Sequence, residues 1–254
     1  MYKGIKDLSI NFFTSTRGHY GYKDVYKKTI ESLSKKFINF YDIRKYANIK
    51  ISPGEEQLSK EIRLFLISHG FQVLCTFGDW NHKDMSAQIG RLEDIYSLNA
   101  YMKADSGPKY GFNLEDDWIF NSEDLTEEFE KALIFLDRNP SFINYRWSRV
   151  DDVDVVNRLN LSEFSYRFEK GIYSSNREYS FNPHFCRNEE QYFISRYCLT
   201  HLPVNQMQCE AAYEIAAKRF ALTDRPFSIK DNKIVEHIGW EWTIKKFIEE
   251  ETKQ

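Results

Sequence analysis

The alternation of strand-like and helix-like segments over the first 140 residues constrains the fold of this chain more than any other feature. Four apolar runs are typical of buried strands, and they cover residues 8–12, 37–43, 71–77 and 110–120. Three segments between them carry apolar residues at helical spacing: Tyr26, Ile30, Leu33 and Phe37; Leu58, Ile62, Phe65 and Leu66; Met85, Ile89, Leu92 and Tyr96. This order predicts an α/β fold, a mostly parallel sheet with helices on both faces.

Capping residues mark the ends of two helices in this region. Ser52-Pro53-Gly54-Glu55 has the form of a capping box and predicts a helix start with Pro53 at the first helical position. Gly70 is expected to end that helix. A further helix is predicted over residues 125–136, with early acids and late basic residues, and Pro140 follows it.

The second half of the chain is less regular. A strand is expected over residues 142–147, and helices over residues 189–199, over residues 207–220 and after Trp240. The 254 residues contain no low-complexity linker or internal repeat, so we expect one domain, 1–254.

Composition excludes several classes of partner and setting. The net charge of −3 comes without a basic stripe, so no nucleic acid partner is expected. No run approaches the roughly 20 apolar residues of a membrane span, and the first residues lack a secretory signal core, so we expect a soluble, cytoplasmic protein with no transmembrane segment. The four cysteines form no CxxC pair, which predicts reduced thiols rather than disulfides or a zinc site.

Three polar sites follow predicted strands. They are the loop that begins at Thr14, Asp79 after the third run, and the triplet Glu115-Asp116-Asp117 within the fourth. Ligands of open parallel sheets bind beyond the carboxyl ends of the strands, so these sites are expected to converge.

The acidic triplet lies between apolar residues, Leu114 before it and Trp118 after it. Adjacent carboxylates repel one another where water is scarce, and a divalent cation would offset that cost while leaving positions open for phosphate. The triplet therefore indicates a metal-diphosphate site. The alternative is that the acids simply begin a loop and favour the N-terminus of the following helix.

Common nucleotide motifs are missing. The chain has no G-x-x-x-x-G-K-[ST] sequence and no GxGxxG after the first strand, which disfavours a P-loop enzyme and a dinucleotide enzyme.

Five short segments occur in an order that resembles one enzyme family. They are Thr14-Ser15-Thr16-Arg17-Gly18, Leu114-Glu115-Asp116-Asp117-Trp118, Ser180-Phe181-Asn182-Pro183 with Arg187, Glu210, and Glu236-His237-Ile238-Gly239. The second is similar to the DxD-type motif of GT-A glycosyltransferases, whose nucleotide-binding loop, acceptor segment, late catalytic acid and C-terminal histidine the others resemble. The resemblance implies a Rossmann-type GT-A-like domain, with residues 1–121 binding the nucleotide sugar and residues 122–254 binding the acceptor.

The resemblance also implies a role for each site residue. Asp117 and His237 would coordinate a divalent metal, and an imidazole ligand favours Mn²⁺ over Mg²⁺. Asp116 would contact the ribose or the metal's water, and Glu115 would help to place the donor sugar. Thr14 and Ser15 would belong to the nucleotide-binding loop. His237 could instead be a hydrogen-bonded turn residue.

Glu210 would be the general base of an inverting transfer, because one carboxylate suffices for a single displacement. Glu214, one helical turn later, is a competing assignment. Either could be a surface acid, and Ala211 stands where the family often has Asp.

Three further residues could contact the donor. Arg17 and Arg91 could each reach a phosphate bidentately, and Asp79 could accept a hydrogen bond from the base or ribose. A solvated or ion-paired role is the alternative for all three.

These expectations together predict a metal-dependent glycosyltransferase that moves a sugar from a UDP- or GDP-linked donor to a hydroxyl of a glycan or other acceptor. The alternatives are a sugar-phosphate nucleotidyltransferase and a non-catalytic nucleotide- or glycan-binding module of the same fold. The sequence carries no signal for the donor sugar, the acceptor or the oligomeric state.

Overall fold

The computed structural model describes residues 3–16, 24–77, 107–149, 167–169, 172–175, 183–203, 209–220 and 227–238. The helical stripe predicted from Met85 to Tyr96 and the helix predicted after Trp240 lie outside these residues. The elements described are η1 (Lys3–Asp7), β1 (Leu8–Ser15), α1 (Val25–Lys36), β2 (Arg44–Ile51), α2 (Glu56–Ser68), β3 (Gln72–Phe77), β4 (Tyr110–Glu115), β5 (Trp118–Phe120), α4 (Thr126–Arg138), β6 (Asn144–Arg149), β7 (Arg167–Glu169), β8 (Ile172–Ser175), β9 (His184–Arg187), α6 (Asn188–His201), α7 (Cys209–Phe220) and β10 (Phe227–His237).

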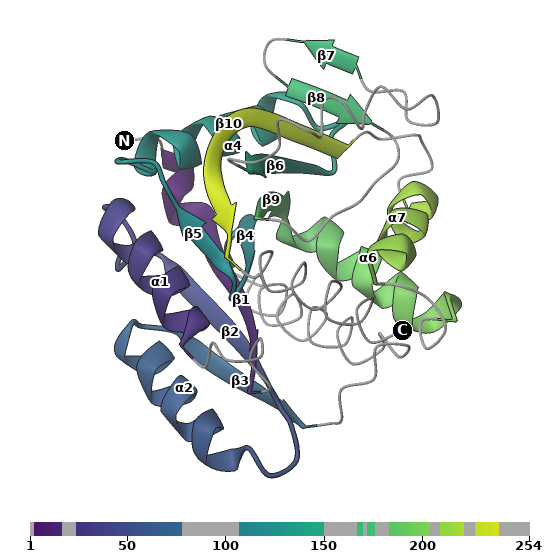
Figure 1. Ribbon diagram of the computed structural model, residues 1–254. Coiled ribbons are helices and arrows are strands. Elements are labelled where there is room, and N and C mark those ends of the chain that lie inside the picture. The colour runs from purple at the N-terminus through teal and green to yellow at the C-terminus, as the bar shows by residue number, and fades with distance from the viewer. Residues whose placement is uncertain are drawn as a thin grey trace, which may run out of the picture.

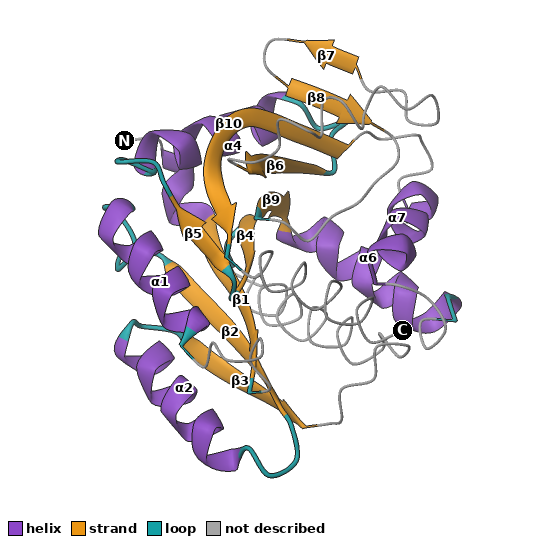
Figure 2. Ribbon diagram, in the orientation of Figure 1, coloured by secondary structure: helices purple, strands orange, loops and turns teal. Residues whose placement is uncertain are grey.

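The strands form one mixed sheet in the order β3-β2-β1-β4-β9-β6-β10-β8-β7, and β5 pairs with β10 beside this path. The four strands β3, β2, β1 and β4 run parallel, as the alternating pattern predicted. Beyond β4 the sheet continues through antiparallel β9, and β10 is parallel to β6 but antiparallel to β8 and β5. Figure 2 shows the strands as a band that runs from β3 to β7.

Helices cover both faces of the sheet, as expected. On one face α1, α2 and α4 pack over the buried side chains of the strands, among them Ile10, Phe112 and Trp147. On the other face α6 and α7 form a smaller cluster around Ile194 and Tyr213. Figure 1 shows α1 and α2 on one side of β1, β2 and β3, and α6 and α7 on the opposite side. The α/β class predicted from the sequence is therefore confirmed.

The strand predicted over residues 37–43 is wrong. This segment forms turns, closed by hydrogen bonds from Phe40 N to Phe37 O and from Asp42 N to Asn39 O, and the second strand is β2. Phe37, Phe40 and Ile43 are buried at a spacing of three residues, whereas the side chains of Ile38 and Tyr41 are exposed. The pattern of β2 is hidden because polar residues such as Asn48 and Lys50 are also buried in it.

The capping box predicted at residues 52–55 is also wrong, because α2 begins only at Glu56 and Glu55 makes no side-chain capping bond. Gly54 has φ +81° and Glu55 N donates to Ser52 O at 3.1 Å. Proline followed by a left-handed glycine is the sequence of a type II turn, which precedes the helix here.

The predicted end of α2 at Gly70 is confirmed. Gly70 has φ +81°, its amide donates to Ile67 O at 2.9 Å, and Phe71 N donates to Leu66 O at 3.0 Å. These bonds form a Schellman motif, which satisfies the last carbonyls of the helix.

In the second half, the predicted strand at residues 142–147 corresponds to β6, and the two predicted helices correspond to α6 and α7. Strands β7, β8, β9 and β10 were not predicted. Among the described residues, no helix is long and apolar enough to cross a membrane.

Candidate active site

The acidic triplet lies at the carboxyl end of the parallel strands, as the sequence predicted. Glu115 is the last residue of β4, and Asp116 and Asp117 form the turn into β5. The neighbouring β1 ends at Ser15, and the next residue, Thr16, ties β1 to β2 through a hydrogen bond from Thr16 N to Lys50 O at 2.9 Å. Two of the expected site segments, the loop that begins at Thr14 and the acidic triplet, therefore lie at the same edge of the sheet.

Asp116 is held by the strand beside it. The Thr14 hydroxyl donates to Oδ2 of Asp116 at 2.5 Å, which joins the first polar loop to the acidic turn. The backbone carbonyl of Asp116 accepts a second hydrogen bond, from the hydroxyl of Thr29 in α1 at 2.7 Å. Thr29 was not singled out from the sequence, because a threonine within a helical stripe carries no signal of its contact.

Asp117 and His237 meet although 120 residues separate them. Nε2 of His237 lies 2.7 Å from Oδ2 of Asp117, and Ile238 N donates to Asp117 O at 2.9 Å. The contact follows from the pairing of β5 with β10, in which His237 is opposite Trp118. The indole of Trp118 lies against the imidazole, with ring centroids 4.7 Å apart. Asp117 is only 4% exposed, so its carboxylate is held in a largely buried place.

This pair suits a divalent cation. A carboxylate oxygen and an imidazole nitrogen are both ligand types of Mn²⁺. Nε2 of His237 and Oδ2 of Asp117, which lie 2.7 Å apart, would hold the ion together. Within the described ranges, no group of three or more His, Cys, Asp or Glu residues is arranged to hold a metal. The remaining ligands of such an ion would come from a diphosphate and water.

Two of the other predicted residues lie on the face of the sheet opposite to α1, and three lie outside the residues that the structure describes. Because side chains alternate along a strand, Ser15 and Glu115 point to the face that α6 covers, whereas Leu114 enters the core under α1. Arg17, Asp79 and Arg91 lie outside the described residues.

Glu210 and Glu214 both belong to α7, which packs against α6. The backbone of Glu210 is in the first turn of the helix. The carboxylate of Glu214 forms an ion pair with Lys218, at 2.5 Å between Oε1 and Nζ. Glu214 thus already has a cationic partner.

Arg187 lies far from the acidic turn. It lies at the end of β9 and pairs in register with Tyr110, the first residue of β4, whereas the acidic turn follows the last residue of β4. At about 3.3 Å per residue, the two ends of β4 are about 17 Å apart. The acceptor segment expected from the resemblance therefore does not bring Arg187 to the acidic turn.

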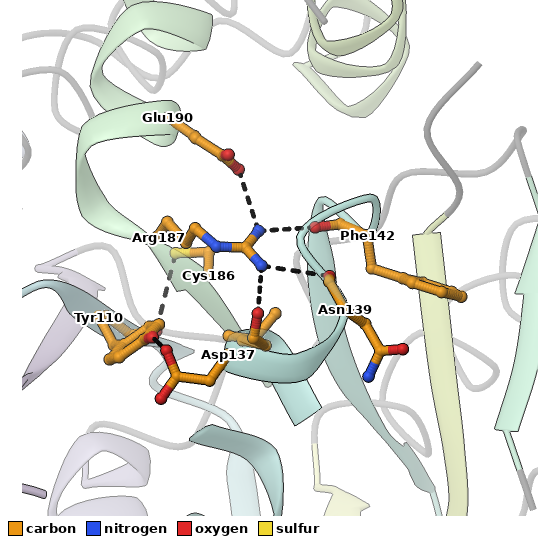
Figure 3. A network of polar contacts seen from close by, with 9 residues as sticks. Tyr110, Asp137, Asn139, Phe142, Cys186, Arg187 and Glu190 are labelled. Atoms are coloured by element: carbon orange, nitrogen blue, oxygen red, sulfur yellow. Dashed lines mark hydrogen bonds and ion pairs between the residues drawn. The ribbon is translucent and has the colours of Figure 1, made fainter. Parts of the chain in front are cut away.

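The guanidinium of Arg187 binds the end of α4 and the loop after it (Figure 3). It donates to Phe142 O at 2.8 Å, to Asn139 O at 3.2 Å and to Leu136 O, and it pairs with Glu190. Beside it the hydroxyl of Tyr110 donates to Asp137, and burial raises the pKa of Tyr110.

Comparison with known proteins gives a structural likeness without a sequence match. No protein-family model matches the chain, and no curated protein matches it. The mannosyltransferase PcManGT from Pyrobaculum calidifontis, solved in complex with GDP-Man and Mn²⁺, superposes with a TM-score of 0.52 at 9% identity. The match covers 90% of this chain and 56% of PcManGT.

Residues 1–349 of TarS from S. aureus superpose with a TM-score of 0.50 at 11% identity, over 89% of this chain and 59% of that one. The chain thus spans less than two thirds of either protein. At these identities the likeness concerns the fold. From its sheet, its helices and these two superpositions, the chain shares the fold of PcManGT and TarS.

Proposed function

We propose that this protein is a metal-dependent glycosyltransferase, which moves a sugar from a UDP- or GDP-linked donor to a hydroxyl of an acceptor. The observation that carries the proposal is the contact between Asp117 and His237, at 2.7 Å, beside the carboxyl ends of the parallel strands. That edge is where open α/β sheets bind their ligands. PcManGT, which shares the fold, was solved with GDP-Man and Mn²⁺, and this agrees with the proposed donor and cation.

In this proposal Asp117 and His237 hold Mn²⁺. When bound, the ion would supply positive charge to the leaving diphosphate. Asp116, fixed by Thr14, would hydrogen-bond the ribose or the metal's water, and Ser15 and Glu115 would line the donor sugar and nucleotide. Arg17, Asp79 and Arg91 would contact the phosphates and the nucleoside. Residues 1–121 would provide most of the donor site and residues 122–254 the acceptor site.

Glu210 would act as the general base. Its carboxylate would take the proton of the acceptor hydroxyl while that oxygen forms a bond to the anomeric carbon. The bond from that carbon to the diphosphate oxygen breaks in the same step, so the configuration inverts. Glu210 is preferred to Glu214 in this proposal because the carboxylate of Glu214 is already engaged by Lys218.

The first experiment measures binding. Mn²⁺ together with GDP or UDP should raise the unfolding temperature more than either component alone. A ligand present at about 100 times its Kd adds about 2.7 kcal/mol to the unfolding free energy, which raises the unfolding temperature by roughly 5–10 °C. Asp117→Asn and His237→Gln should remove this response. Glu236→Gln is the matched control, because Glu236 precedes His237 in β10 and is exposed. No response of the unaltered protein to any metal and nucleotide would overturn the proposal.

The second experiment measures turnover. With Mn²⁺ and a panel of UDP- and GDP-sugars, we expect release of the nucleoside diphosphate, and NMR of the product should show an inverted anomer. Glu210→Gln should abolish turnover and keep the thermal response, whereas Glu214→Gln should keep both. The reverse result would make Glu214 the base, and binding without turnover of any donor would indicate a binding module. Pyrophosphate release from a nucleoside triphosphate and a sugar phosphate would indicate a nucleotidyltransferase.

A further inference from the structure

Strand β5 has a strand on one edge and a helix on the other. Its pairing with β10 satisfies the edge that includes Asn121 N and Asp117 O, which bond to Ile234 O and Ile238 N. Helix α1 covers the opposite edge, against which it packs closely. A strand edge carries a row of peptide groups that need partners, so the side chains of α1 must supply them.

Thr29 supplies the partners nearest to the acidic turn. Its hydroxyl donates to Asp116 O at 2.7 Å and accepts from Trp118 N at 3.2 Å. One side chain thus bridges the peptide groups on both sides of Asp117. Thr29 is completely buried, so water has no access to replace these bonds.

Ser32 and Lys36 continue the same row one and two turns later. Phe120 N donates to the Ser32 hydroxyl at 3.4 Å, and Lys36 Nζ donates to Phe120 O. The spacing of three and seven residues from Thr29 puts all three side chains on one face of α1. A polar stripe of the helix therefore takes the place of a neighbouring strand.

The two edges together fix Asp117. Its carbonyl is bound to β10 through Ile238, its flanking peptides are bound to α1 through Thr29, and its carboxylate meets His237. A rotation of either flanking peptide would move the carboxylate away from the imidazole. Loss of a group that orients a metal ligand typically lowers metal affinity by about 10- to 100-fold.

From this geometry we propose that Thr29 is a positioning residue of the cation site, which sets the orientation of Asp117 toward His237 through the two peptide groups it bridges. The inference rests on the proposed function, because it concerns the same metal pair. Thr29 would not bind the cation itself, but it would make α1 one of the elements that position the cation site.

The test uses three variants of the full chain. Thr29→Val keeps the shape and removes both hydrogen bonds, and Thr29→Ser keeps the hydroxyl. Ser32→Ala removes a bond from the same stripe, at a peptide three residues further along β5 from Asp117, and is the matched control. Mn²⁺ binding is measured from the electron paramagnetic resonance signal of the free ion, with and without GDP, on protein that circular dichroism shows to be folded.

We expect Thr29→Val to weaken Mn²⁺ binding roughly 10-fold or more, and Thr29→Ser and Ser32→Ala to bind within about 2-fold of the unaltered protein. If Thr29→Val binds Mn²⁺ as tightly as the unaltered protein, the effect is absent and the inference is overturned. If Ser32→Ala loses as much affinity as Thr29→Val, the effect is one of general stability, and the inference is likewise overturned.

A second measurement does not depend on the metal. Hydrogen exchange of the Trp118 amide should be roughly 10-fold faster in Thr29→Val than in Thr29→Ser. If the unaltered protein binds no Mn²⁺ with or without GDP, the proposed function fails while this exchange result still decides whether Thr29 fixes the turn. Unchanged exchange in folded Thr29→Val would refute the positioning role itself.

Discussion

Replacement of Arg187 by methionine tests whether its network is structural. The substitution removes the guanidinium from the carbonyls of Leu136, Asn139 and Phe142, and from Glu190. The side chain is 13% exposed, so water can restore few of these bonds. Each carbonyl left without its donor costs on the order of 1 kcal/mol or more, and with the charged donor we expect a loss of about 3–5 kcal/mol in unfolding free energy.

The assay is urea unfolding followed by circular dichroism, together with the Mn²⁺ and GDP thermal response. A loss of this size lowers the unfolding temperature by roughly 6–20 °C for a chain of this length. The stability of Arg187→Lys should lie between that of the unaltered protein and that of Arg187→Met, because a lysine ammonium cannot donate the paired hydrogen bonds of the planar guanidinium. Lys109→Met is the control: it breaks the neighbouring, exposed ion pair with Asp137 and should cost about 0–1 kcal/mol.

The folded fraction of Arg187→Met should bind Mn²⁺ like the unaltered protein, because Arg187 lies at the far end of β4 from the acidic turn. Two results would refute the reasoning. One is a destabilisation no larger than that of Lys109→Met. The other is loss of Mn²⁺ binding at full stability, which would show that Arg187 acts on the proposed cation site.

Three further predictions concern stability. A Cβ on Gly111 would lie 2.4 Å from Asn188 Oδ1 and 2.5 Å from Asn11 Nδ2, so Gly111→Ala should cost about 1–3 kcal/mol in urea unfolding; a neutral result would mean that this buried layer can move apart. Gly70→Ala should cost about 1–2 kcal/mol and Gly70→Asn less, since the φ of +81° is left-handed; equal costs would contradict this. Burial raises the pKa of Cys198 to about 12, so its contribution to stability is complete below about pH 8.5, where the unfolded thiol begins to ionise, and is lost progressively up to about pH 12. Cys198→Ala should therefore flatten the alkaline fall in unfolding free energy by up to about 1.4 kcal/mol per pH unit, and an unchanged slope would argue against it.

The parts of the fold that followed from sequence are those with one polar and one apolar face. Helices α1, α2 and α4 show a clean stripe because their outer faces meet water. Strand β2 escaped recognition because both of its faces are buried and one of them is polar, with Tyr46, Asn48 and Lys50 under neighbouring elements. Hydrophobic periodicity reveals an element only when one of its faces is apolar and the other polar and exposed. A strand buried on both faces shows little of this contrast.

The site was predictable only in part, for a similar reason. The triplet was visible because three acids interrupt an apolar run. His237 was identified only through the family resemblance. The sequence of β10 has Lys-Asp-Asn-Lys in its middle and therefore lacks the pattern of a strand. The contact between Asp117 and His237 depends on strand pairing, which no local pattern encodes. The roles of these residues in metal binding stay predictions, as does the role of Glu210.

The path of β10 has a consequence for how the protein comes to be made. This strand joins β6 and β8 near its start, shifts register between Lys230 and Val235, and reaches β5 only with its last residues. Figure 1 shows it bending across the molecule toward β5. A ribosome delivers the acidic turn early and His237 more than a hundred residues later, so a nascent chain can build the parallel strands long before it can bring His237 to Asp117. The proposed cation site would therefore form only after synthesis and sheet assembly have reached β10.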